Sequence, residues 1–559
     1  MKYQKLSALA LSGALIFSMN LTAAAAPVTP EAKQTAGNND IVILHTNDVH
    51  CAIDNAIGYA GVAAYKAEME AIYGEDRVTL VDAGDAIQGG AIGTLSEGAF
   101  LVDIMNQTGY DIAVPGNHEF DYGMENFLTL AKERADYQYI CANFIDLSTG
   151  VGVFPPYKII DYGDTQIAYI GIDTPESFTK STPAYFQDEH GNYIYNFCQG
   201  NNGADLYNVV QLSVDSARSE GADYVIAVGH LGTEGSYQEW QSASVLGNTA
   251  GIDAFIDGHS HESYSKTVKN KAGKDVLLVQ TGSKLNAIGK LVLDPDTGKI
   301  TDELITDYET KEPVTKQFIS ALQEGFAGIL DQVVAQTEVS LSSSDPVTGK
   351  RLIRNTETNL GDFVADAYRN VMNADIGLAN GGGIRADLKQ GDLTYEDIIN
   401  VHPYGNEMCV VEATGQEILD ALELGASKYP EEHGGFLQVS GLSYTIDLSV
   451  PSSVVRSDEG EFIRVNGAYR VKNVLVNGEP LDLSRTYTVA SHNYMLKNGG
   501  DGYVMFKDNN LIKDCTMLDN EALIEYITKN LGGSIGKEYA DPYGQGRITI
   551  VSQSTANAA

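Results

Sequence analysis

The amino-acid sequence predicts a two-domain chain in which an α/β domain is followed by an α+β domain. In the first half, short apolar runs of strand length alternate with helix-length segments. In the second half, helix-length segments are mixed with alternating patterns that are typical of half-buried strands. At 559 residues, the chain is also long enough for about two or three domains.

The N-terminus carries the pattern of an export signal. Two lysines precede an apolar run from Leu6 to Met19, and small residues follow from Ala23 to Ala26. We expect residues 1–26 to be a signal peptide and 27–39 a disordered leader, so that the mature protein is secreted to the periplasm, cell surface or medium. An uncleaved anchor is the alternative; no later stretch is apolar over about 18 residues, so no other membrane span is expected.

Composition narrows the possible partners. Hydrophobic residues make up 43% and charged residues 20% of the chain, which is typical of a soluble globular protein. The formal charge of −38 repels polyanions and excludes duplex nucleic acid as a partner, so a small anionic substrate needs a local cluster of cations. The five cysteines are widely spaced without a C-x-x-C pair, which excludes a thiolate zinc site and leaves their pairing open.

Six apolar runs predict the buried strands of the first domain, which we expect to end near residue 308. A region from Ser177 to Tyr207 is rich in Tyr, Phe, Asn and Gly and indicates a long loop or cap. The six runs are Ile41–Leu44, Val78–Val81, Ile112–Val114, Val225–Val228, Ala254–Ile256 and Val276–Val279.

A polar stretch with a proline, Thr310–Lys316, marks a boundary between the domains. Apolar residues from Phe318 to Val334 then recur at helical spacing and predict a linker helix, within a linker of 309–335. The second domain is expected over 336–551, with a helix around Leu360–Val371, strands at Ile376–Leu378 and Leu442–Leu448, and a hairpin turn at Asn477-Gly478. Residues 552–559 are expected to be a disordered tail.

Polar side chains stand directly behind five of the predicted strands. Because strand ends in α/β folds meet at one edge, these side chains are expected to converge, and neighbouring glycines let the backbone turn sharply toward the common centre. Asp, His and Asn suit zinc, manganese, cobalt or iron, and an Asp can bridge two ions about 3.5–4 Å apart. In chain order the candidates are Asp48 and His50, Asp85, Asn117 and His118, His230, and His259 and His261.

The order D-x-H, G-D, G-N-H-E, G-H, G-H-x-H resembles that of the calcineurin-like metallophosphoesterases, over about residues 40 to 300. The resemblance implies a β-sandwich flanked by helices over 40–308, with two bound ions. It implies His118 as the non-ligand histidine that stabilises charge or protonates the leaving oxygen, and Asp121 as the carboxylate that orients it. For His45 and Glu119 we prefer a packing or supporting role. The implied ligands are Asp48, His50 and His261 for one ion, Asn117, His230 and His259 for the other, and Asp85 as the bridge.

The second half resembles the C-terminal domain of 5′-nucleotidases over about residues 335 to 550. The residues that carry this resemblance are Arg354, Asn359–Asp362, Asn380–Arg385, Gly435–Gly441 and Asn498–Tyr503. The resemblance implies phosphate contacts from Arg354 and Arg385 and nucleoside contacts from Asn380 and Asp501. Gly382 and Gly383 allow close backbone approach to a ligand.

This family usually holds the base between two aromatic rings. Tyr404 matches the first position, where stacking contributes about 1–3 kcal/mol. Met495 matches the second position, with Tyr494 beside it, so the chain departs from the pattern. Either Tyr494 takes the role, or Met495 makes a softer sulfur contact.

Together these patterns predict a secreted, metal-dependent 5′-nucleotidase whose site forms between two domains. A 2′,3′-cyclic-nucleotide 2′-phosphodiesterase with 3′-nucleotidase activity, or a UDP-sugar hydrolase, would use the same metal ligands on a different substrate. A surface protein that binds nucleotides without turnover is a third hypothesis, against which the full set of ligand candidates argues. The sequence does not decide the native metal or the oligomeric state.

Overall fold

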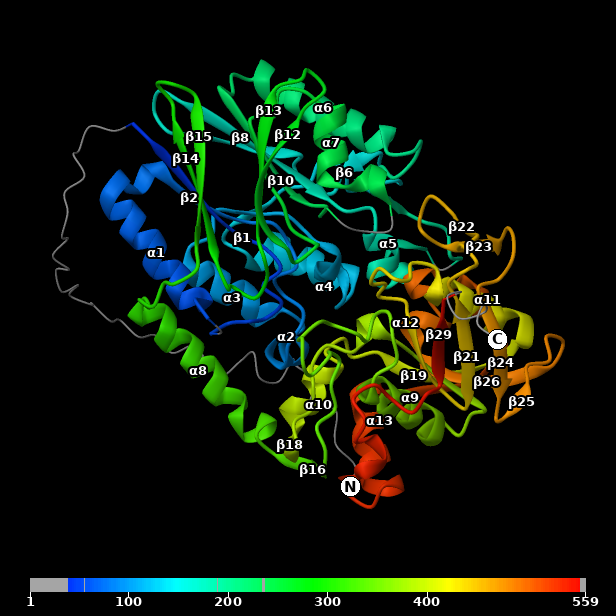
Figure 1. The fold of residues 1–559 in the computed structure, drawn as a ribbon. Coiled ribbons are helices and arrows are strands. Elements are labelled where there is room, and N and C mark those ends of the chain that lie inside the picture. The colour runs from blue at the N-terminus through cyan, green and yellow to red at the C-terminus, as the bar shows by residue number, and fades with distance from the viewer. Residues whose placement is uncertain (1–38, 55, 189, 234–236, 553–559) are drawn as a thin grey trace, which may run out of the picture.

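The computed structural model describes residues 39–54, 56–188, 190–233 and 237–552. The predicted signal peptide, nearly all of the leader and the last residues of the tail lie outside the described residues. Figure 1 shows two domains, with helix α8 (Pro313–Leu330) running along the first domain toward the second. Among the described residues, no helix has the length and apolar character needed to cross a membrane.

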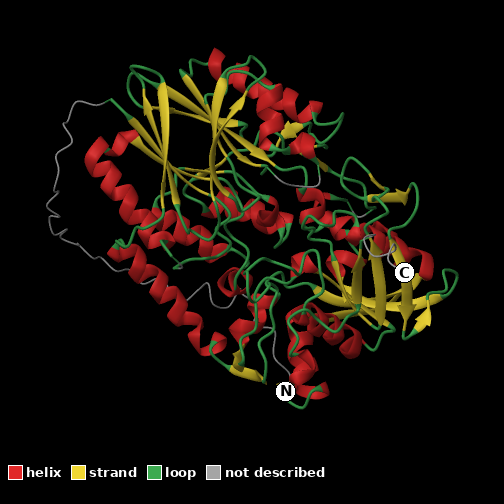
Figure 2. Cartoon of the chain, in the orientation of Figure 1, coloured by secondary structure: helices red, strands yellow, loops and turns green. Residues whose placement is uncertain are grey.

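The N-terminal domain is a sandwich of two six-stranded mixed sheets, with helices on the outer faces (Figure 2). The first sheet has the order β15 (Lys299–Ile305), β14 (Ile288–Asp294), β1 (Ile41–Thr46), β2 (Val78–Asp82), β3 (Ile112–Ala113) and β4 (Gln138–Tyr139). The second has the order β12 (Ser263–Lys269), β13 (Asp275–Thr281), β11 (Ala254–Ile256), β10 (Tyr224–His230), β8 (Gln166–Asp173) and β7 (Tyr157–Asp161). This confirms the predicted helix-flanked β-sandwich.

Burial on both faces explains why the central strands read as continuous apolar runs. In β1, Ile41 and Ile43 pack in the core between the two sheets, whereas Val42 and Leu44 pack toward helices α1 (Gly58–Tyr73) and α3 (Ala99–Thr108). Successive side chains of a strand point to opposite faces, so both must be apolar when both faces are covered.

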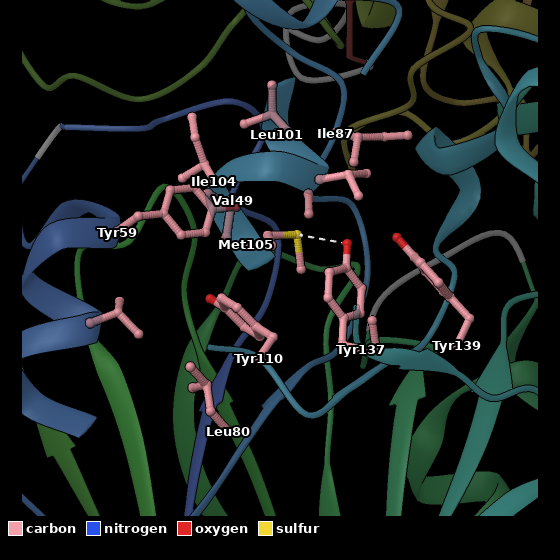
Figure 3. Close-up of a cluster of buried hydrophobic side chains, with 14 of the residues drawn as sticks. Val49, Tyr59, Leu80, Ile87, Leu101, Ile104, Met105, Tyr110, Tyr137 and Tyr139 are labelled. Carbon is pink, nitrogen blue, oxygen red and sulfur yellow. Dashed lines mark hydrogen bonds between the residues drawn. The ribbon is translucent and has the colours of Figure 1, made fainter. Parts of the chain in front are cut away.

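Aromatic side chains fill the layer between the first sheet and its helices (Figure 3). Tyr110 packs edge-on against Tyr59 of α1, and the Tyr137 hydroxyl donates to Met105 Sδ of α3 at 3.3 Å. On the other side, Val225 and Ala227 of β10 pack in the cluster of α6 (Ala204–Ser219) and α7 (Ser242–Asn248).

The strands that precede the candidate site run parallel, so their carboxyl ends share an edge. β1, β2 and β3 are parallel neighbours, and so are β8, β10, β11 and β13. All six predicted strands are present. Strand β8 was not among the predicted runs, because Tyr169 and Gly171 interrupt its apolar pattern.

The linker helix is shorter than predicted. Helix α8 begins at Pro313, where the Glu312 carboxylate accepts hydrogen bonds from the amides of Val314 and Thr315 at 3.0 and 2.6 Å. It ends at Leu330, so the prediction that Val333 and Val334 continue the helix is wrong. These β-branched residues start strand β16 (Val333–Thr337), which pairs with β18 (Gly391–Thr394).

The segment predicted as a long loop contains ordered elements. It holds α5 (Ser177–Lys180), the short strand β9 (Tyr195–Asn196) and, from Ala204, the start of α6. Phe178, Phe186 and Phe197 bury their rings against one another, with centroids 5.1 to 5.5 Å apart. The aromatic residues that made this segment unusual in composition therefore join the core of the N-terminal domain, where they also pack against Phe120 and Phe144.

The C-terminal domain is α+β, as predicted. Its turn at Asn477-Gly478 joins the antiparallel strands β24 and β25, and both turn residues have positive φ, as a type I′ hairpin requires. Helix α9 (Asn359–Met372) covers one face of the larger sheet. That sheet has the order β20 (Leu437–Ser440), β17 (Ile376–Asn380), β26 (Thr486–His492), β19 (Glu407–Thr414) and β27 (Leu511–Leu518); the smaller one has β25 (Glu479–Pro480), β24 (Val471–Val476), β21 (Leu442–Asp447) and β29 (Ile548–Val551).

Candidate functional site

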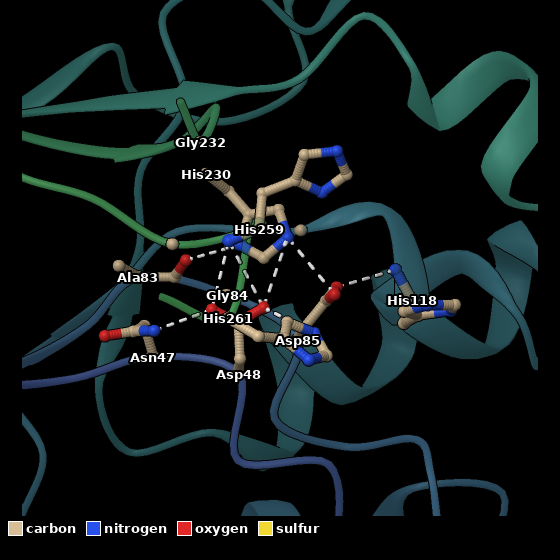
Figure 4. A network of polar contacts seen from close by, with 12 residues as sticks. Asn47, Asp48, Ala83, Gly84, Asp85, His118, His230, Gly232, His259 and His261 are labelled. Carbon is tan, nitrogen blue, oxygen red and sulfur yellow. Dashed lines mark hydrogen bonds and ion pairs between the residues drawn. The ribbon is translucent and has the colours of Figure 1, made fainter. Parts of the chain in front are cut away.

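The structure brings the predicted metal-ligand candidates together where the parallel strands of the N-terminal domain end, and Figure 4 shows Asp48, Asp85, His230, His259 and His261 converging there. Donor atoms of Asp48, His50, Asp85 and His261 lie within 4.8 Å of one another, and so do those of Asp85, His230 and His259. Asp85 belongs to both groups, as the family resemblance implies for a bridging ligand.

The backbone is strained where these side chains turn inward. Asp85 has a φ of +60° and His259 a φ of +76°, and Asp48, His50 and His261 also lie in the left-handed region, which non-glycine residues rarely adopt. Glycine is needed where the loops touch, because a Cβ at Gly116 would lie 2.4 Å from Asp85 Oδ1. Strain of this kind is typical of sites whose geometry is fixed for function.

Hydrogen bonds leave a free lone pair on several ring nitrogens. His230 Nδ1 donates to the carbonyl oxygen of Ala83 at 2.7 Å, so its Nε2 is the ring nitrogen that faces the other ligand candidates. His50 Nδ1 donates in the same way to the Gln88 carbonyl at 3.0 Å. His259 reverses the pattern, because its Nε2 donates to Glu176 Oε2 at 2.9 Å and its buried Nδ1 has no hydrogen-bond partner among the described residues.

These ring nitrogens face a carboxylate oxygen or another ring nitrogen, which is the arrangement expected of ligands that share a cation. His230 Nε2 lies 3.1 Å from Asp85 Oδ2, and the Nε2 atoms of His50 and His261 lie 3.0 Å apart. Asn117 Oδ1 is also buried without a partner among the described residues. Protonation of the ring nitrogens would leave the Asn117 amide oxygen without a partner. Divalent ions bound between these side chains would satisfy both the ring nitrogens and the amide oxygen. The residues therefore fit a site for divalent metal ions.

Burial and charge set the protonation states of the ligand candidates: burial lowers the pKa of His230, but the Asp85 carboxylate outweighs it and raises that pKa well above 6.5. Burial lowers the pKa of His50 well below 6.5 and also lowers that of His261, so both imidazoles are neutral near pH 7. For Asp85, burial favours the neutral acid, but the nearby imidazoles of His230 and His118 outweigh burial and hold its pKa well below 3.8.

His118 stands apart from these histidines. Its Nδ1 donates to Asp121 Oδ2 at 2.5 Å, and Asp121 Oδ1 accepts from Ser181 Oγ at 2.8 Å. Burial disfavours the imidazolium, but the carboxylates of Asp85 and Asp121 outweigh it and raise the pKa of His118 above 6.5. His118 thus lies beside His50 at this cluster, with its ring held by Asp121 and its imidazolium form favoured.

Glu119 and His45 support this centre without facing it. The Glu119 carboxylate accepts from the backbone amides of Asp85, Ala86 and Gly116 at 2.7 to 2.8 Å, and so ties the β2 loop to the β3 loop. His45 lies within β1 and is 2% exposed. Both placements agree with the supporting roles that we expected.

A cavity of about 820 Å³ lies between the two domains and joins the metal centre to the predicted substrate residues. Its walls come from both domains, so neither domain alone encloses it. The predicted site residues that line it are Asp85, Asn117, His118, Asp121, His259, His261, Arg354, Asn380, Gly382, Gly383, Arg385, Tyr404, Tyr494 and Asp501.

Arg354 and Arg385 give the cavity a local positive charge in an acidic protein. Burial, together with Arg351 and Arg385 nearby, lowers the pKa of Arg354 to about 9, which still leaves it charged at neutral pH. Within the described part of the chain, no carboxylate oxygen lies within 4.0 Å of either guanidinium. Two unpaired arginines beside a metal centre are suited to bind phosphate.

Asn380 and Asp501 form a polar pair on the wall of the cavity that the C-terminal domain supplies. Asn380 Nδ2 donates to Asp501 Oδ2 at 2.7 Å, and His492 Nε2 donates to Asn380 Oδ1 at 3.1 Å. A Cβ at Gly382 would lie 3.0 Å from the backbone of Gly434, so glycine keeps this loop close to its neighbour.

The structure separates the two candidates for the second base contact. Tyr494 lines the cavity, whereas Met495 is fully buried in the core of the C-terminal domain and does not line it. Neighbouring residues on the turn α12 (Asn493–Leu496) point about 100° apart, so only one of them faces the cavity. The assignment of Met495 to substrate binding is therefore wrong.

Glu176, Lys180 and His492 also line the cavity and were not predicted from the sequence. Glu176 follows β8 in the pattern Asp-Thr-Pro-Glu, so it stands behind a strand like the other site residues and was missed because the strand was missed. Lys180 lines the cavity from the following turn. His492 is the last residue of β26, just as His230 is the last residue of β10. The position at a strand end that identified His230 could therefore have identified His492 as well.

Comparisons with known proteins agree with this geometry. A model of the calcineurin-like phosphoesterases matches residues 41–263, and a model of the 5′-nucleotidase C-terminal domain matches residues 333–508. The chain is 28% identical to a 5′-nucleotidase of Vibrio cholerae, over 93% of this chain and 95% of that protein. It is 26% identical to a trifunctional nucleotide phosphoesterase of Bacillus subtilis, over 92% of this chain but only 35% of that longer protein. The crystal structure of a 5′-nucleotidase precursor from Thermus thermophilus superposes with a TM-score of 0.75 at 28% identity, over 92% of this chain and 99% of that one.

Proposed function

The chain belongs to the 5′-nucleotidase family of metal-dependent phosphoester hydrolases, and on that premise we propose that it is a secreted two-metal 5′-nucleotidase. It would hydrolyse nucleoside 5′-monophosphates to nucleoside and phosphate. One observation carries the proposal: the metal-ligand cluster of the first domain and the unpaired arginines of the second line one cavity. A nucleoside monophosphate has the matching parts, a phosphate at one end and a base and ribose at the other.

The side chains divide the chemistry among them. Asp48, His50 and His261 would hold one ion and Asn117, His230 and His259 the other, with Asp85 shared between them. Two divalent ions in such a site supply Lewis-acid polarisation of the phosphate and activation of the attacking water.

The remaining groups act on the substrate directly. Arg354 and Arg385 hold the phosphate in place, because paired N–H donors fit two phosphate oxygens. His118 keeps Nδ1 bound to Asp121, so its Nε2 proton is available to the leaving ribose oxygen. Tyr404 and Tyr494 offer rings to the base, and Asn380 and Asp501 offer polar contacts to the nucleoside.

A substrate panel tests the proposal. We expect hydrolysis of AMP, stimulated by manganese, zinc or cobalt, with a higher kcat/KM than for 3′-AMP, 2′,3′-cyclic AMP or UDP-glucose. A higher kcat/KM on one of the other three substrates would mean that hydrolysis of that substrate, and not of AMP, is the main activity of the protein. Nucleotide binding without metal-dependent phosphate release would favour a binding protein and overturn the proposal.

Arg385→Ala is expected to raise the KM for AMP and to lower kcat/KM about 10- to 100-fold, because a charge-assisted contact to phosphate is lost. Steady-state phosphate release measures both constants. Arg134→Ala is the matched control, since Arg134 forms an ion pair with Asp103 at 2.6 Å and does not line the cavity. An unchanged KM in Arg385→Ala, or an equal change in the control, would remove Arg385 from the phosphate site.

The boundaries of the chain are part of the same proposal. We assign residues 1–26 to a cleaved signal peptide, 40–308 and 336–551 to the two domains, and 309–335 to the linker. Sequencing the N-terminus of the exported protein tests the cleavage. A mature chain that still begins at Met1 would exclude it.

A further inference from the structure

A short segment of the N-terminal domain, Glu176–Ser181, contacts the metal centre, the acid group and the nucleoside end of the cavity. It follows strand β8 and contains the single turn α5, which lies on the side of this domain that faces the C-terminal domain (Figure 1). We call it the α5 segment.

The two ends of the α5 segment hold reacting groups. At its start, the Glu176 carboxylate accepts from His259 Nε2 at 2.9 Å, which leaves His259 Nδ1 free to bind an ion. At its end, Ser181 Oγ donates to Asp121 Oδ1 at 2.8 Å, and Asp121 in turn holds His118. A shift of the segment would therefore move a ligand and the proton donor together.

The middle of the α5 segment is held by the other domain. The Tyr494 hydroxyl donates to the carbonyl oxygen of Thr179 at 2.5 Å and accepts from the Asp501 amide at 3.0 Å. Lys180 Nζ lies 3.3 Å from Asp501 Oδ1, while Asn380 occupies Oδ2 of the same carboxylate. Asp501 is nearly buried, with 3% of its side chain exposed, so solvent screens this ion pair only weakly.

The segment is stiff enough to connect these contacts. Ser177 Oγ donates to the buried Asp173 at 3.2 and 3.3 Å, and the fully buried Phe178 ring packs against Phe186 and Phe197. A close-packed element of this kind transmits a displacement instead of absorbing it.

We propose that the α5 segment couples the nucleoside end of the site to the metal centre, and that Lys180 and Tyr494 are positioning residues for phosphate hydrolysis. Their contacts hold the segment in the place where Glu176 orients His259 and Ser181 orients Asp121. The inference rests on the proposed function, because it assigns the nucleoside to Asn380 and Asp501. It adds that the α5 segment of the N-terminal domain transmits nucleoside binding to the metal ligands and to His118.

A double-mutant cycle on kcat for AMP tests the coupling. Tyr494→Phe removes the hydroxyl that bonds Thr179, and Ser181→Ala removes the hydroxyl that bonds Asp121. Each is expected to lower kcat about five- to tenfold. The double variant is expected to lose clearly less than the product of the two factors, because both changes release the same segment. A loss equal to the product would overturn the proposal.

The matched control is a second contact across the domains that bypasses the α5 segment. Lys507 Nζ donates to Gln187 Oε1 at 3.0 Å, so Lys507→Met weakens domain closure without removing a contact of the α5 segment. Combined with Ser181→Ala, it is expected to give multiplicative effects. Equal non-additivity in this pair would assign the coupling to domain closure in general and overturn the role of the segment.

Variants of Lys180 distinguish a positioning role from direct contact with the nucleoside. Lys180→Met is expected to lower kcat about fivefold on both AMP and p-nitrophenyl phosphate, which has no nucleoside, and Lys180→Arg is expected to restore most of it. A change confined to the KM for AMP would contradict the proposal. If wild-type enzyme hydrolyses p-nitrophenyl phosphate but not AMP, the 5′-nucleotidase proposal fails, and the same cycle on p-nitrophenyl phosphate still tests the segment. Melting temperatures within a few degrees of wild type establish that each variant is folded.

Discussion

Asp85→Asn is expected to lower kcat/KM for AMP by on the order of 10³-fold or more, with loss of bound metal. Asp85 is common to both donor groups of the site, and its Oδ2 lies 3.1 Å from His230 Nε2 and 3.7 Å from His50 Nε2. An amide keeps the shape but loses the charge that would bridge two cations. Activity is measured as phosphate release under saturating manganese.

Asp82→Asn is the matched control for this variant. Asp82 ends the same strand and is 1% exposed, but its carboxylate is used by Thr46 Oγ1 at 2.6 Å and by the Gly84 amide at 3.0 Å. We expect it to keep its metal and to lose no more than about tenfold in kcat/KM. A loss of less than tenfold in Asp85→Asn, or equal losses in both variants, would contradict the bridging role.

His118→Ala is expected to lower kcat for AMP about 10²- to 10⁴-fold while metal content stays at the wild-type value. The raised pKa of His118, caused by Asp85 and Asp121 against the effect of burial, keeps a proton on Nε2 for the leaving oxygen. The ribose 5′ oxygen is a poor leaving group and needs that proton. The p-nitrophenolate group leaves easily without it.

The comparison of the two substrates gives this prediction its sharpest form. For p-nitrophenyl phosphate, the loss in His118→Ala is expected to be at least about tenfold smaller than for AMP, because only charge stabilisation is missing. Equal losses on both substrates would assign His118 to charge stabilisation alone. A loss of less than tenfold on AMP would remove His118 from the reaction.

The metal centre was predictable because strand ends carry positional information. Asp48, Asp85 and His230 each follow or end an apolar run, and parallel strands bring such positions to one edge whatever lies between them in sequence. The same rule explains the omission of Glu176. Its strand, β8, contains Tyr169 and Gly171, so the apolar run was not recognised and the carboxylate behind it was not examined.

The substrate side was less predictable, because its geometry depends on single turns and on the distance between domains. Tyr494 and Met495 are neighbours in sequence, and only the orientation of the turn α12 decides which one faces the cavity. The contact of Lys180 with Asp501 joins residues 321 positions apart, and no local pattern encodes it. The end of α8 was misplaced because Val333 and Val334 fit the helical period by coincidence, while both belong to strand β16, in which Val333 pairs with Thr394.

Metal content per chain tests the central claim most directly. Purified wild-type protein and Asp85→Asn, both loaded with manganese or zinc and freed of excess ion, are analysed by inductively coupled plasma mass spectrometry alongside the activity assay. The dinuclear account predicts two equivalents of metal in active wild-type chains and at most one in the variant. Full activity with one equivalent or none, or two equivalents in both proteins, would contradict it.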